Sequence, residues 1–174
     1  MVNLEDVRKQ YDIAELNRNQ LSESPIDMFR KWFEDVEELD NIEPNAMALA
    51  TASNKGKPSS RIVLLKEFDE RGFVFYTNYN SKKGRQIERN PYGSLTFYWH
   101  QLERQVRIRG KIRKNSREKS QKYFLSRPRL SQISVLASNQ SEVLNNRNEL
   151  ENKVQEIEIE YNSKEIPVPD NWGG

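Results

Sequence analysis

The sequence predicts a fold that is mainly β with helices, built from antiparallel strands. About five strand-like runs follow one another with helices between them, and the strand–helix–strand rhythm of a parallel sheet is missing. Residues 105–113 alternate strictly between apolar or glycine positions and basic ones, as in a strand with one face on a core. These observations favour an antiparallel barrel or an α+β arrangement over a doubly wound sheet. At 174 residues we expect one domain, 1–174.

Composition excludes several classes of protein. The chain has no cysteine and one histidine, His100, which excludes disulfides, thiol catalysis, zinc clusters and a Ser-His-Asp triad, and we expect no metal site. No apolar run approaches the roughly 18 residues needed to cross a membrane. Residues 1–6 lack the basic and apolar regions of a signal peptide. We therefore expect a cytoplasmic protein that does not bind membranes.

The N-terminal part, residues 1–42, is expected to be a helical segment. Apolar side chains at helical spacing favour a short helix over residues 2–11. Ser24 and Pro25 have the order of a helix cap and a first helical residue. Apolar positions spaced i, i+3, i+4 and i+7 follow, so we expect this helix to run to about Leu39 with one buried face.

Residues 43–174 are expected to contain the barrel and the other helices. Residues 46–53 are small and apolar and predict a strand that ends in a turn. The runs 61–66 and 73–78 are rich in β-branched and aromatic residues. Because the polar, glycine-containing turn 69–72 joins them, we expect the two runs to form a hairpin.

The remaining elements follow from the same patterns. Residues 82–90 predict a short helix that ends at a proline, and 92–99 and 105–113 predict two further strands. Three helical segments follow, and the last is the longest, with an acid and a base four residues apart. We expect these segments at residues 116–125, near 130–137 and at 141–161.

Charge is strongly segregated although the net charge is +2. Residues 1–54 carry a net −7 and residues 55–113 a net +9, while 114–140 add +5 and 141–174 return −5. A basic middle indicates an anionic partner, which is either a phosphorylated small molecule or a nucleic acid.

Candidate phosphate ligands cluster near the ends of the expected hairpin. The chain has no Gly-rich phosphate loop, so side-chain cations and hydroxyls have to hold a phosphate. This arrangement suits a ligand with a flat ring and a phosphate, and solvated strand ends are the alternative. The candidates are Arg61, Lys66, Tyr76, Thr77, Lys82 and Lys83.

Further candidates are weaker when taken alone. Tyr123, Arg127 and Ser131 are spaced by four and can grip a phosphate from one side of a helix, with packing or solvation as the alternative. Gln140 and Ser141 precede the long helix, where a helix cap is the alternative reading.

Nucleic-acid binding is not expected. The basic face of residues 105–113 can contact phosphates of RNA or DNA. However, its neighbours are not the aromatic stacking set of an RNA-binding sheet. Gln105 opens this strand and by itself indicates no function. Trp99 is expected in the core and His100 on the surface.

Ten short motifs in this order carry a family resemblance. They are Arg8-Lys-Gln-Tyr11, Arg61-Ile-Val-Leu-Leu-Lys66, Phe75-Tyr-Thr-Asn78, Ser81-Lys-Lys83, Trp99-His100, Leu102-Glu-Arg-Gln-Val106, Tyr123-Phe-Leu-Ser-Arg-Pro-Arg129, Ser131-Gln-Ile133, Gln140-Ser141 and Trp172-Gly-Gly174. The chain resembles the pyridoxamine 5'-phosphate oxidases, FMN enzymes of vitamin B6 metabolism, from about Val7 to Gly174. Ordered matches of this number are far more specific than any one of them.

The resemblance implies an FMN-binding split β-barrel that forms a homodimer with two FMN sites at the subunit interface. It implies that the B6 vitamer is held by Lys66, Tyr123, Arg127 and Ser131 at its phosphate, with Arg8 and Tyr11 closing over it. It also implies a set of FMN contacts, some reaching from the partner subunit. These are Arg61, Ile62, Val63, Leu64, Lys66, Tyr76, Thr77, Lys82, Lys83, Gln105, Gln140 and Ser141.

The reaction implied by the resemblance is oxidation of pyridoxamine or pyridoxine 5'-phosphate to pyridoxal 5'-phosphate. Hydride passes from the C4' carbon to the flavin, and O2 reoxidises the flavin and gives H2O2. Because the cofactor carries the chemistry, the protein needs no nucleophile or metal of its own.

One departure from the family bears on activity. Its members continue beyond Trp-Gly-Gly with strands that carry a Trp, an Arg-x-His pair and another Arg, whereas this sequence stops at Gly174. No catalytic residue is therefore assigned, and we expect an exposed sheet edge. The alternatives are another split-barrel flavin oxidoreductase and a non-catalytic protein that binds FMN or pyridoxal phosphate.

Overall fold

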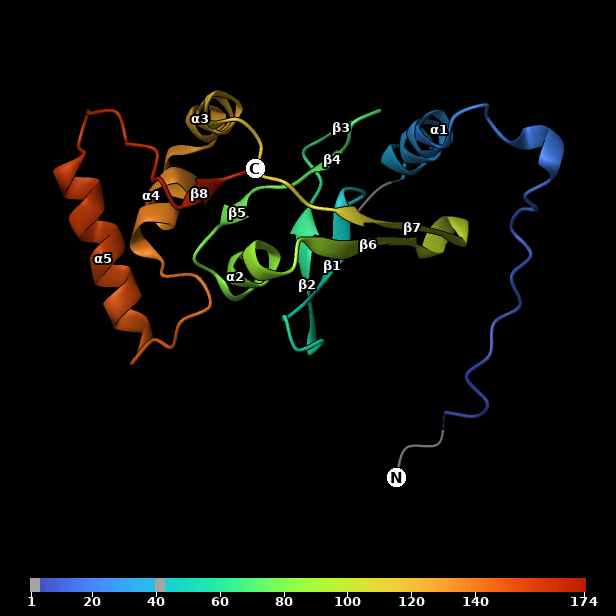
Figure 1. The fold of residues 1–174 in the computed structure, drawn as a ribbon, viewed down its shortest axis with the longest axis horizontal. Coiled ribbons are helices and arrows are strands. Elements are labelled where there is room, and N and C mark those ends of the chain that lie inside the picture. The colour runs from blue at the N-terminus through green and yellow to red at the C-terminus, as the bar shows by residue number, and fades with distance from the viewer. Residues whose placement is uncertain (1–3, 40–42) are drawn as a thin grey trace.

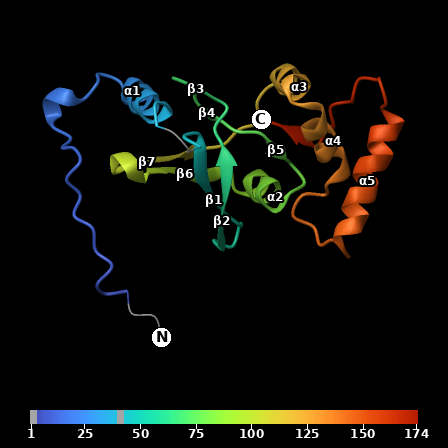
Figure 2. The ribbon, with the colours of Figure 1, turned by 180° about the vertical axis from the view of Figure 1, so that it is seen from behind.

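A four-stranded antiparallel sheet lies at the centre of the structure, a computed structural model that describes residues 4–39 and 43–174. Figure 1 shows the helices α3, α4 and α5 on one side of this sheet and α1 with the N-terminal segment on the other, and Figure 2 shows the same arrangement from behind. The strands, in spatial order, are β2 (Pro58–Leu64), β1 (Ala46–Ala52), β6 (Tyr92–Trp99) and β7 (Arg104–Lys111).

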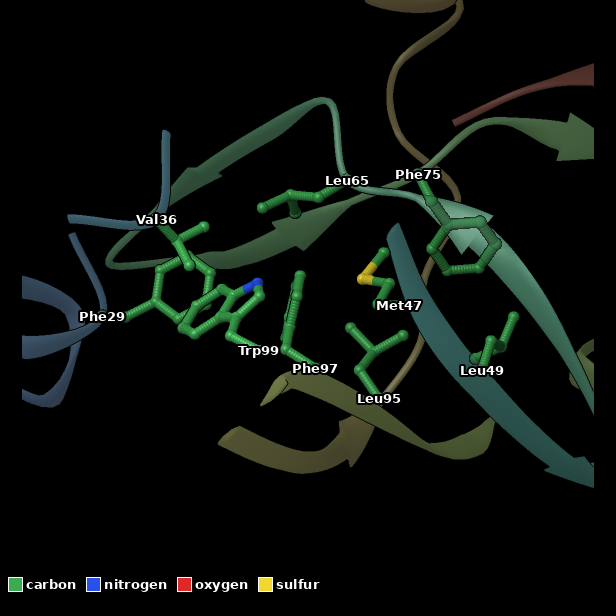
Figure 3. Close-up of a cluster of buried hydrophobic side chains, with 9 residues drawn as sticks. All are labelled: Phe29, Val36, Met47, Leu49, Leu65, Phe75, Leu95, Phe97 and Trp99. Carbon is green, nitrogen blue, oxygen red and sulfur yellow. The ribbon is translucent and has the colours of Figure 1, made fainter. Parts of the chain in front are cut away.

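The first hydrophobic core fills the inner face of this sheet. The hairpin of β3 (Glu67–Asp69) and β4 (Gly72–Val74) and the helix α1 (Pro25–Glu37) pack against that face. Phe29 of α1 is 4% exposed and makes edge contacts with Phe68 and Phe73, with ring centroids 4.8 and 4.9 Å away. Figure 3 shows the buried side chains of α1 against those of the strands. Burying each such side chain contributes about 1.5–3 kcal/mol.

A second, smaller core joins the C-terminal helices to the end of the chain. Phe124, Ile133, Ile166 and Trp172 are its buried members. The strand β5 pairs with β8, and α2 packs against β1. The bounds are β5 (Thr77–Asn78), α2 (Lys82–Arg89), α3 (Arg117–Ser126), α4 (Arg129–Ala137), α5 (Arg147–Glu160) and β8 (Trp172–Gly173), with short 3-10 helices η1 (Arg18–Gln20) and η2 (His100–Leu102).

The helix starts agree with the sequence. The Ser24 side chain accepts a hydrogen bond from the Ile26 amide, and Pro25 begins α1. Ser81 caps α2 and Ser116 caps α3 in the same way. Each hydroxyl satisfies an amide that the first helical turn leaves without a partner. The expected strands at 46–53, 92–99 and 105–113 are confirmed as β1, β6 and β7, with ends that differ by one or two residues.

Two helix predictions are wrong: the first predicted helix is absent from the described residues, and the last one begins later than predicted. Residues 4–11 are not helical, and residues 2 and 3 lie outside the described part. Tyr11 is 70% exposed, so the apolar stripe there has no surface to bury against, and a short helix is marginal without packing. The last helix begins at Arg147, not at Ser141. Asn146 caps it, while Ser141 has a φ of 75°, which no helix accommodates.

The expected hairpin is also corrected. The turn at 70–71 is present, but it joins β3 to β4, which are three residues each. The run 61–64 belongs to β2, which pairs with β1 along all seven residues. The run 61–64 pairs with β1 because this longer pairing satisfies more backbone groups than pairing with the run after the turn would.

The antiparallel prediction is confirmed, but the strands of residues 4–39 and 43–174 form three separate sheets and not one closed barrel. None of the helices in these ranges is long and apolar enough to cross a membrane. Within the same ranges, no group of three or more His, Cys, Asp or Glu residues is arranged to hold a metal ion.

Candidate cofactor and substrate site

Arg61 is held against the inner face of the sheet by a polar network. Its guanidinium donates to the Leu49 carbonyl at 3.0 Å, to Thr51 Oγ1 at 2.8 Å and to Ser59 Oγ at 2.8 Å. The two hydroxyls in turn donate to Gln86 Oε1 of α2 at 2.6 and 2.7 Å. The strand register makes this possible, because it pairs Leu49 with Arg61 and Thr51 with Ser59. Burial lowers the pKa of Arg61.

Lys83 is a buried cation close to Arg61. The residue is 8% exposed, and its Nζ donates to Gln140 Oε1 at 2.8 Å and to Thr77 Oγ1 at 3.1 Å, with Ser81 Oγ at 3.5 Å. Burial first, and then the charge of Arg61, lower the pKa of Lys83 to about 8. All of these acceptors are neutral, so the charge lacks a compensating carboxylate among them, and an anion is the ligand that this site favours.

A cavity of about 410 Å³ connects this cation site to the α3–α4 junction. Thr77, Gln140, Arg127 and Ser131 are all among the residues that line it. The helices place the latter pair: Arg127 ends α3 as its C-cap, and Ser131 follows in the first turn of α4. Residues that are far apart in the sequence therefore share one cavity. Arg127 lines it, and Lys83 is hydrogen-bonded to two of its lining residues, Thr77 and Gln140.

Three parallel aromatic rings form an apolar wall beside this cavity. The rings of Tyr76 and Tyr123 lie 3.9 Å apart at an interplanar angle of 23°, and those of Tyr76 and Trp172 lie 5.4 Å apart at 19°. The ring of Tyr123 is inclined by 5° to that of Trp172 at 6.2 Å. Burial raises the pKa of Tyr76, so its hydroxyl stays neutral at physiological pH.

The Arg127 guanidinium lies over the Trp172 ring, with 5.0 Å between its carbon and the ring centroid. Its Nη1 is buried and has no hydrogen-bond partner in the described part of the chain. Burial also lowers the pKa of this group. A buried donor without an acceptor costs about 1–3 kcal/mol. A phosphate oxygen would satisfy it, and this fits the phosphate role predicted for Arg127.

Most of the other predicted FMN contacts lie away from this cavity. Ile62 and Gln105 are exposed on the outer face of the sheet, because side chains alternate along a strand and Arg61 points inward. Val63 packs against the first core, and Leu64, which alternation places on the opposite face, is half-buried. The remaining predicted cofactor residues outside the cavity are exposed; they are Lys66, Lys82 and Ser141.

Arg8 and Tyr11 are not brought to the cavity. Both are exposed, and the Arg8 side chain donates to the Glu5 carbonyl at 3.0 Å. The segment is anchored at Glu103, which pairs with Lys9 at 2.9 Å and accepts from the Ile13 amide at 3.1 Å. In Figure 1 the N-terminal segment runs on the side of the sheet opposite to α3, α4 and α5.

Sequence reasoning missed four residues of this site. Trp172 stands in the Trp172-Gly-Gly174 motif, but that motif alone gives it no role at the site. Thr51, Ser59 and Gln86 fix Arg61 in place. They carry no signal in the sequence, because their grouping depends on which strands pair.

A family model described as pyridoxamine 5'-phosphate oxidase matches residues 34–161. The chain belongs to the pyridoxamine 5'-phosphate oxidase family. A pyridoxine/pyridoxamine 5'-phosphate oxidase of Trichormus variabilis is 47% identical over 169 residues, which are 97% of this chain and 79% of that protein. One of Salinibacter ruber is 48% identical over 175 residues, covering 100% and 81%. These names support an oxidoreductase of the pyridoxamine 5'-phosphate oxidase family.

Solved structures agree on the fold. PhzG from Burkholderia lata, crystallised with tetrahydrophenazine-1-carboxylic acid, matches with a TM-score of 0.84 and 27% identity over 89% of this chain and 76% of PhzG. An FMN-binding protein of Nostoc punctiforme related to pyridoxamine 5'-phosphate oxidase matches with a TM-score of 0.59 and 17% identity, over 75% and 73%. The antiparallel sheets and helices of this chain thus match the split-barrel, flavin-binding fold of pyridoxamine 5'-phosphate oxidases, as predicted.

Proposed function

We propose that this chain binds FMN and oxidises pyridoxamine or pyridoxine 5'-phosphate to pyridoxal 5'-phosphate, with O2 as the acceptor and H2O2 as a product. The observation that carries the proposal is the shared cavity. It joins Thr77 and Gln140, which are proposed cofactor contacts, to Arg127 and Ser131, which are proposed substrate contacts. The names of the curated relatives support the same assignment.

Arg61, Thr77, Lys83 and Gln140 would hold FMN. Arg61 and Lys83 are fixed cations with neutral hydrogen-bond partners, so they offer charge-assisted hydrogen bonds to a phosphate. Their positions are set before binding by the contacts with β1, Ser81 and Thr77, which lowers the ordering cost of binding. When bound, the flavin supplies the acceptor for a hydride from the C4' carbon of the substrate, and O2 reoxidises it.

Tyr123, Arg127 and Ser131 would hold the phosphate of the substrate. The unpartnered Nη1 of Arg127 donates to a phosphate oxygen, and the Ser131 hydroxyl adds a second donor. The parallel rings beside the cavity exclude water from this wall, which strengthens the charged hydrogen bonds. Lys66 is proposed for the same phosphate from the sequence pattern, and Arg8 and Tyr11 are proposed to close over the substrate.

We also propose a homodimer with FMN at its interface. Ile62 and Gln105 are exposed on the outer face of the sheet, away from the cation site of their own chain. A second copy that covers this face would bring them to a cofactor. Lys82 and Ser141, which are exposed as well, complete the proposed contact set with Tyr76, Val63 and Leu64.

A second candidate is a different split-barrel flavin oxidoreductase. The similarity to PhzG, which was crystallised with a ring compound that carries a carboxylate, favours it. Arg127 pairs with carboxylate as readily as with phosphate. Comparing a B6 phosphate with tetrahydrophenazine-1-carboxylic acid as the substrate separates the two candidates.

The test is an anaerobic reduction assay. The protein is loaded with FMN, pyridoxine 5'-phosphate is added, and the visible flavin absorbance is followed before and after air is admitted. We expect bleaching, then recovery of the absorbance with formation of pyridoxal 5'-phosphate. Pyridoxine without its phosphate is the control and should bleach far more slowly. Bound flavin that the phosphate ester leaves oxidised would contradict the proposal.

A further inference from the structure

Arg117 binds the backbone of the segment that leads to Trp172. From the first turn of α3, its Nη2 donates to the Val168 carbonyl at 2.6 Å, and its Nη1 donates to the carbonyls of Pro169 at 2.9 Å and Trp172 at 3.3 Å. Its Nη2 also contacts the Asp170 carboxylate at 3.2 Å. One planar guanidinium thus binds three carbonyls of a five-residue segment, which an ammonium cannot do with the same geometry.

This segment is also held from β8 and from Gly174, whose carbonyl accepts from the Asn115 amide at 2.8 Å and whose amide donates to Ser120 Oγ at 3.2 Å. The strand β8 has only two residues, and it pairs with β5 through Asn78 and Thr77. The Tyr79 amide adds one hydrogen bond to the Asn171 carbonyl at 2.6 Å. A two-stranded sheet of this length is marginal on its own, and the bonds from Arg117 are the side-chain contacts that hold the Val168 and Pro169 carbonyls before it.

Trp172 is the contact that orients Arg127. The indole ring contacts both the guanidinium of Arg127, at 5.0 Å from its centroid, and the ring of Phe124, at 5.3 Å between centroids and an interplanar angle of 72°. Trp172 is 5% exposed and lines the cavity together with Arg127. A shift of the indole therefore moves the surface on which the Arg127 guanidinium lies.

We propose that Arg117 is a positioning residue for the substrate phosphate. It fixes residues 168–172, which holds the Trp172 ring against Arg127 and aims the unpartnered Nη1 into the cavity. Arg117 itself does not line that cavity. The inference rests on the proposed function, because the phosphate is that of the B6 vitamer.

The test measures binding of pyridoxal 5'-phosphate by titration calorimetry, with FMN affinity followed separately by flavin fluorescence. We expect Arg117→Ala and Arg117→Lys to weaken pyridoxal 5'-phosphate binding about tenfold, as for one misaligned charge-assisted hydrogen bond. FMN affinity should fall by less than pyridoxal 5'-phosphate affinity, because Arg117 contacts neither Arg61 nor Lys83 and reaches Thr77 only through the pairing of β5 with β8. Asp170→Asn is the matched control. It removes only an exposed carboxylate and leaves the three carbonyl bonds, so it should bind as the wild type does.

A double-mutant cycle with Arg127→Ala separates positioning from a general loss of stability. If Arg117 acts through Arg127, Arg117→Ala adds no further loss of affinity in the Arg127→Ala protein. Additive losses would overturn the inference, and so would an unchanged affinity in Arg117→Ala or a parallel fall in FMN affinity. A wild-type protein that binds FMN but not pyridoxal 5'-phosphate would overturn both the inference and the proposed function. If the wild type binds both ligands and Arg117→Ala binds pyridoxal 5'-phosphate equally well, the inference alone is overturned.

Discussion

Arg127 has a buried donor that costs the fold stability and that we propose to bind the substrate phosphate. Its Nη1 is buried without an acceptor, and burial lowers its pKa. We expect Arg127→Met to weaken pyridoxal 5'-phosphate binding by about tenfold to a hundredfold, the loss of a charge-assisted hydrogen bond. The free energy of unfolding should not fall, because an apolar side chain leaves no buried donor unsatisfied. Calorimetric titration and urea unfolding measure the two quantities.

The control for this prediction is Arg89→Met, which removes an exposed arginine at the end of α2. It should change neither pyridoxal 5'-phosphate affinity nor stability by more than about 0.5 kcal/mol. Unaltered binding in Arg127→Met would contradict the phosphate role of Arg127.

Lys83 predicts a dependence of FMN binding on pH. Its pKa is lowered to about 8 from the ordinary 10.5, chiefly by burial. The charge that we propose to pair with the flavin phosphate is therefore lost as the pH rises through about 8, and FMN affinity should fall in that range. Lys83→Arg keeps its charge at these pH values, so its affinity should stay flat. Flavin fluorescence titrations between neutral and alkaline pH measure this, and an equal fall in both proteins would argue against Lys83.

The same residue affects stability with a definite sign. Between pH 8 and 10.5 the unfolded chain keeps the Lys83 proton while the folded chain has lost it. Stability rises with pH wherever the unfolded state binds more protons. Titration of Lys83 therefore makes the FMN-free protein more stable as the pH rises across that window. The Lys83→Arg protein should lack this increase in stability.

At the scale of elements, α2 carries Lys83 and lies very close to the chain before it. A Cβ on Gly84 would overlap the backbone carbonyl of Tyr79, whereas a Cβ on Gly110 would meet open space. We expect Gly84→Ala to destabilise the protein by about 1–3 kcal/mol and to weaken FMN binding, because α2 has to move away together with Lys83. The gain in helix propensity, up to about 1 kcal/mol, is smaller.

Gly110→Ala is the matched control for that prediction. Gly110 is an exposed residue of β7 with no atom within 4 Å of an added Cβ. It should unfold in urea at the wild-type midpoint or slightly above it, because alanine loses less entropy than glycine on folding. Equal stability of the two alanine variants would show that α2 does not depend on the close approach at Tyr79.

Local rules predicted the elements well where the signal is local. Ser24, Ser81 and Ser116 each begin a helix because a hydroxyl caps the free amides of its first turn. The longest helix was placed six residues early, because its pattern continues upstream of Asn146 and the left-handed backbone of Ser141 has no mark in the sequence. Residue patterns report periodicity, but not the backbone conformation that interrupts it.

Pairing between distant segments was less predictable. The sequence placed Arg61 in a hairpin with the run after the turn, whereas the structure pairs its strand with β1. This register, not the motif, brings Thr51 and Ser59 to the guanidinium. The roles proposed for the residues of the cavity came from ordered motifs. Their grouping around Trp172, however, depends on packing that no local pattern encodes.

At the scale of the whole molecule, the outer face of the central sheet has no cover in the described structure. The strand register places Ile62, Tyr92 and Tyr98 on this face, and their exposed fractions are 65%, 64% and 61%. Large exposed side chains grouped on one sheet face indicate an interaction surface. A stable dimer needs about 800 Å² per partner, and the outer side chains of all four strands are available to such a contact.

We therefore expect the wild-type protein to sediment as a dimer and Tyr98→Glu to shift it towards monomer. The introduced carboxylate would replace an aromatic ring in the interface and lose its hydration there, which costs several kcal/mol. Val143→Glu is the control, since Val143 is 98% exposed in the loop before α5, away from this face. Sedimentation velocity at micromolar concentrations measures both.

If the cofactor lies at the interface, Tyr98→Glu also loses FMN affinity while Val143→Glu keeps it. A wild-type monomer that binds FMN normally would show that one chain completes the cofactor site, and the exposed Ile62 and Gln105 would then have no part in it.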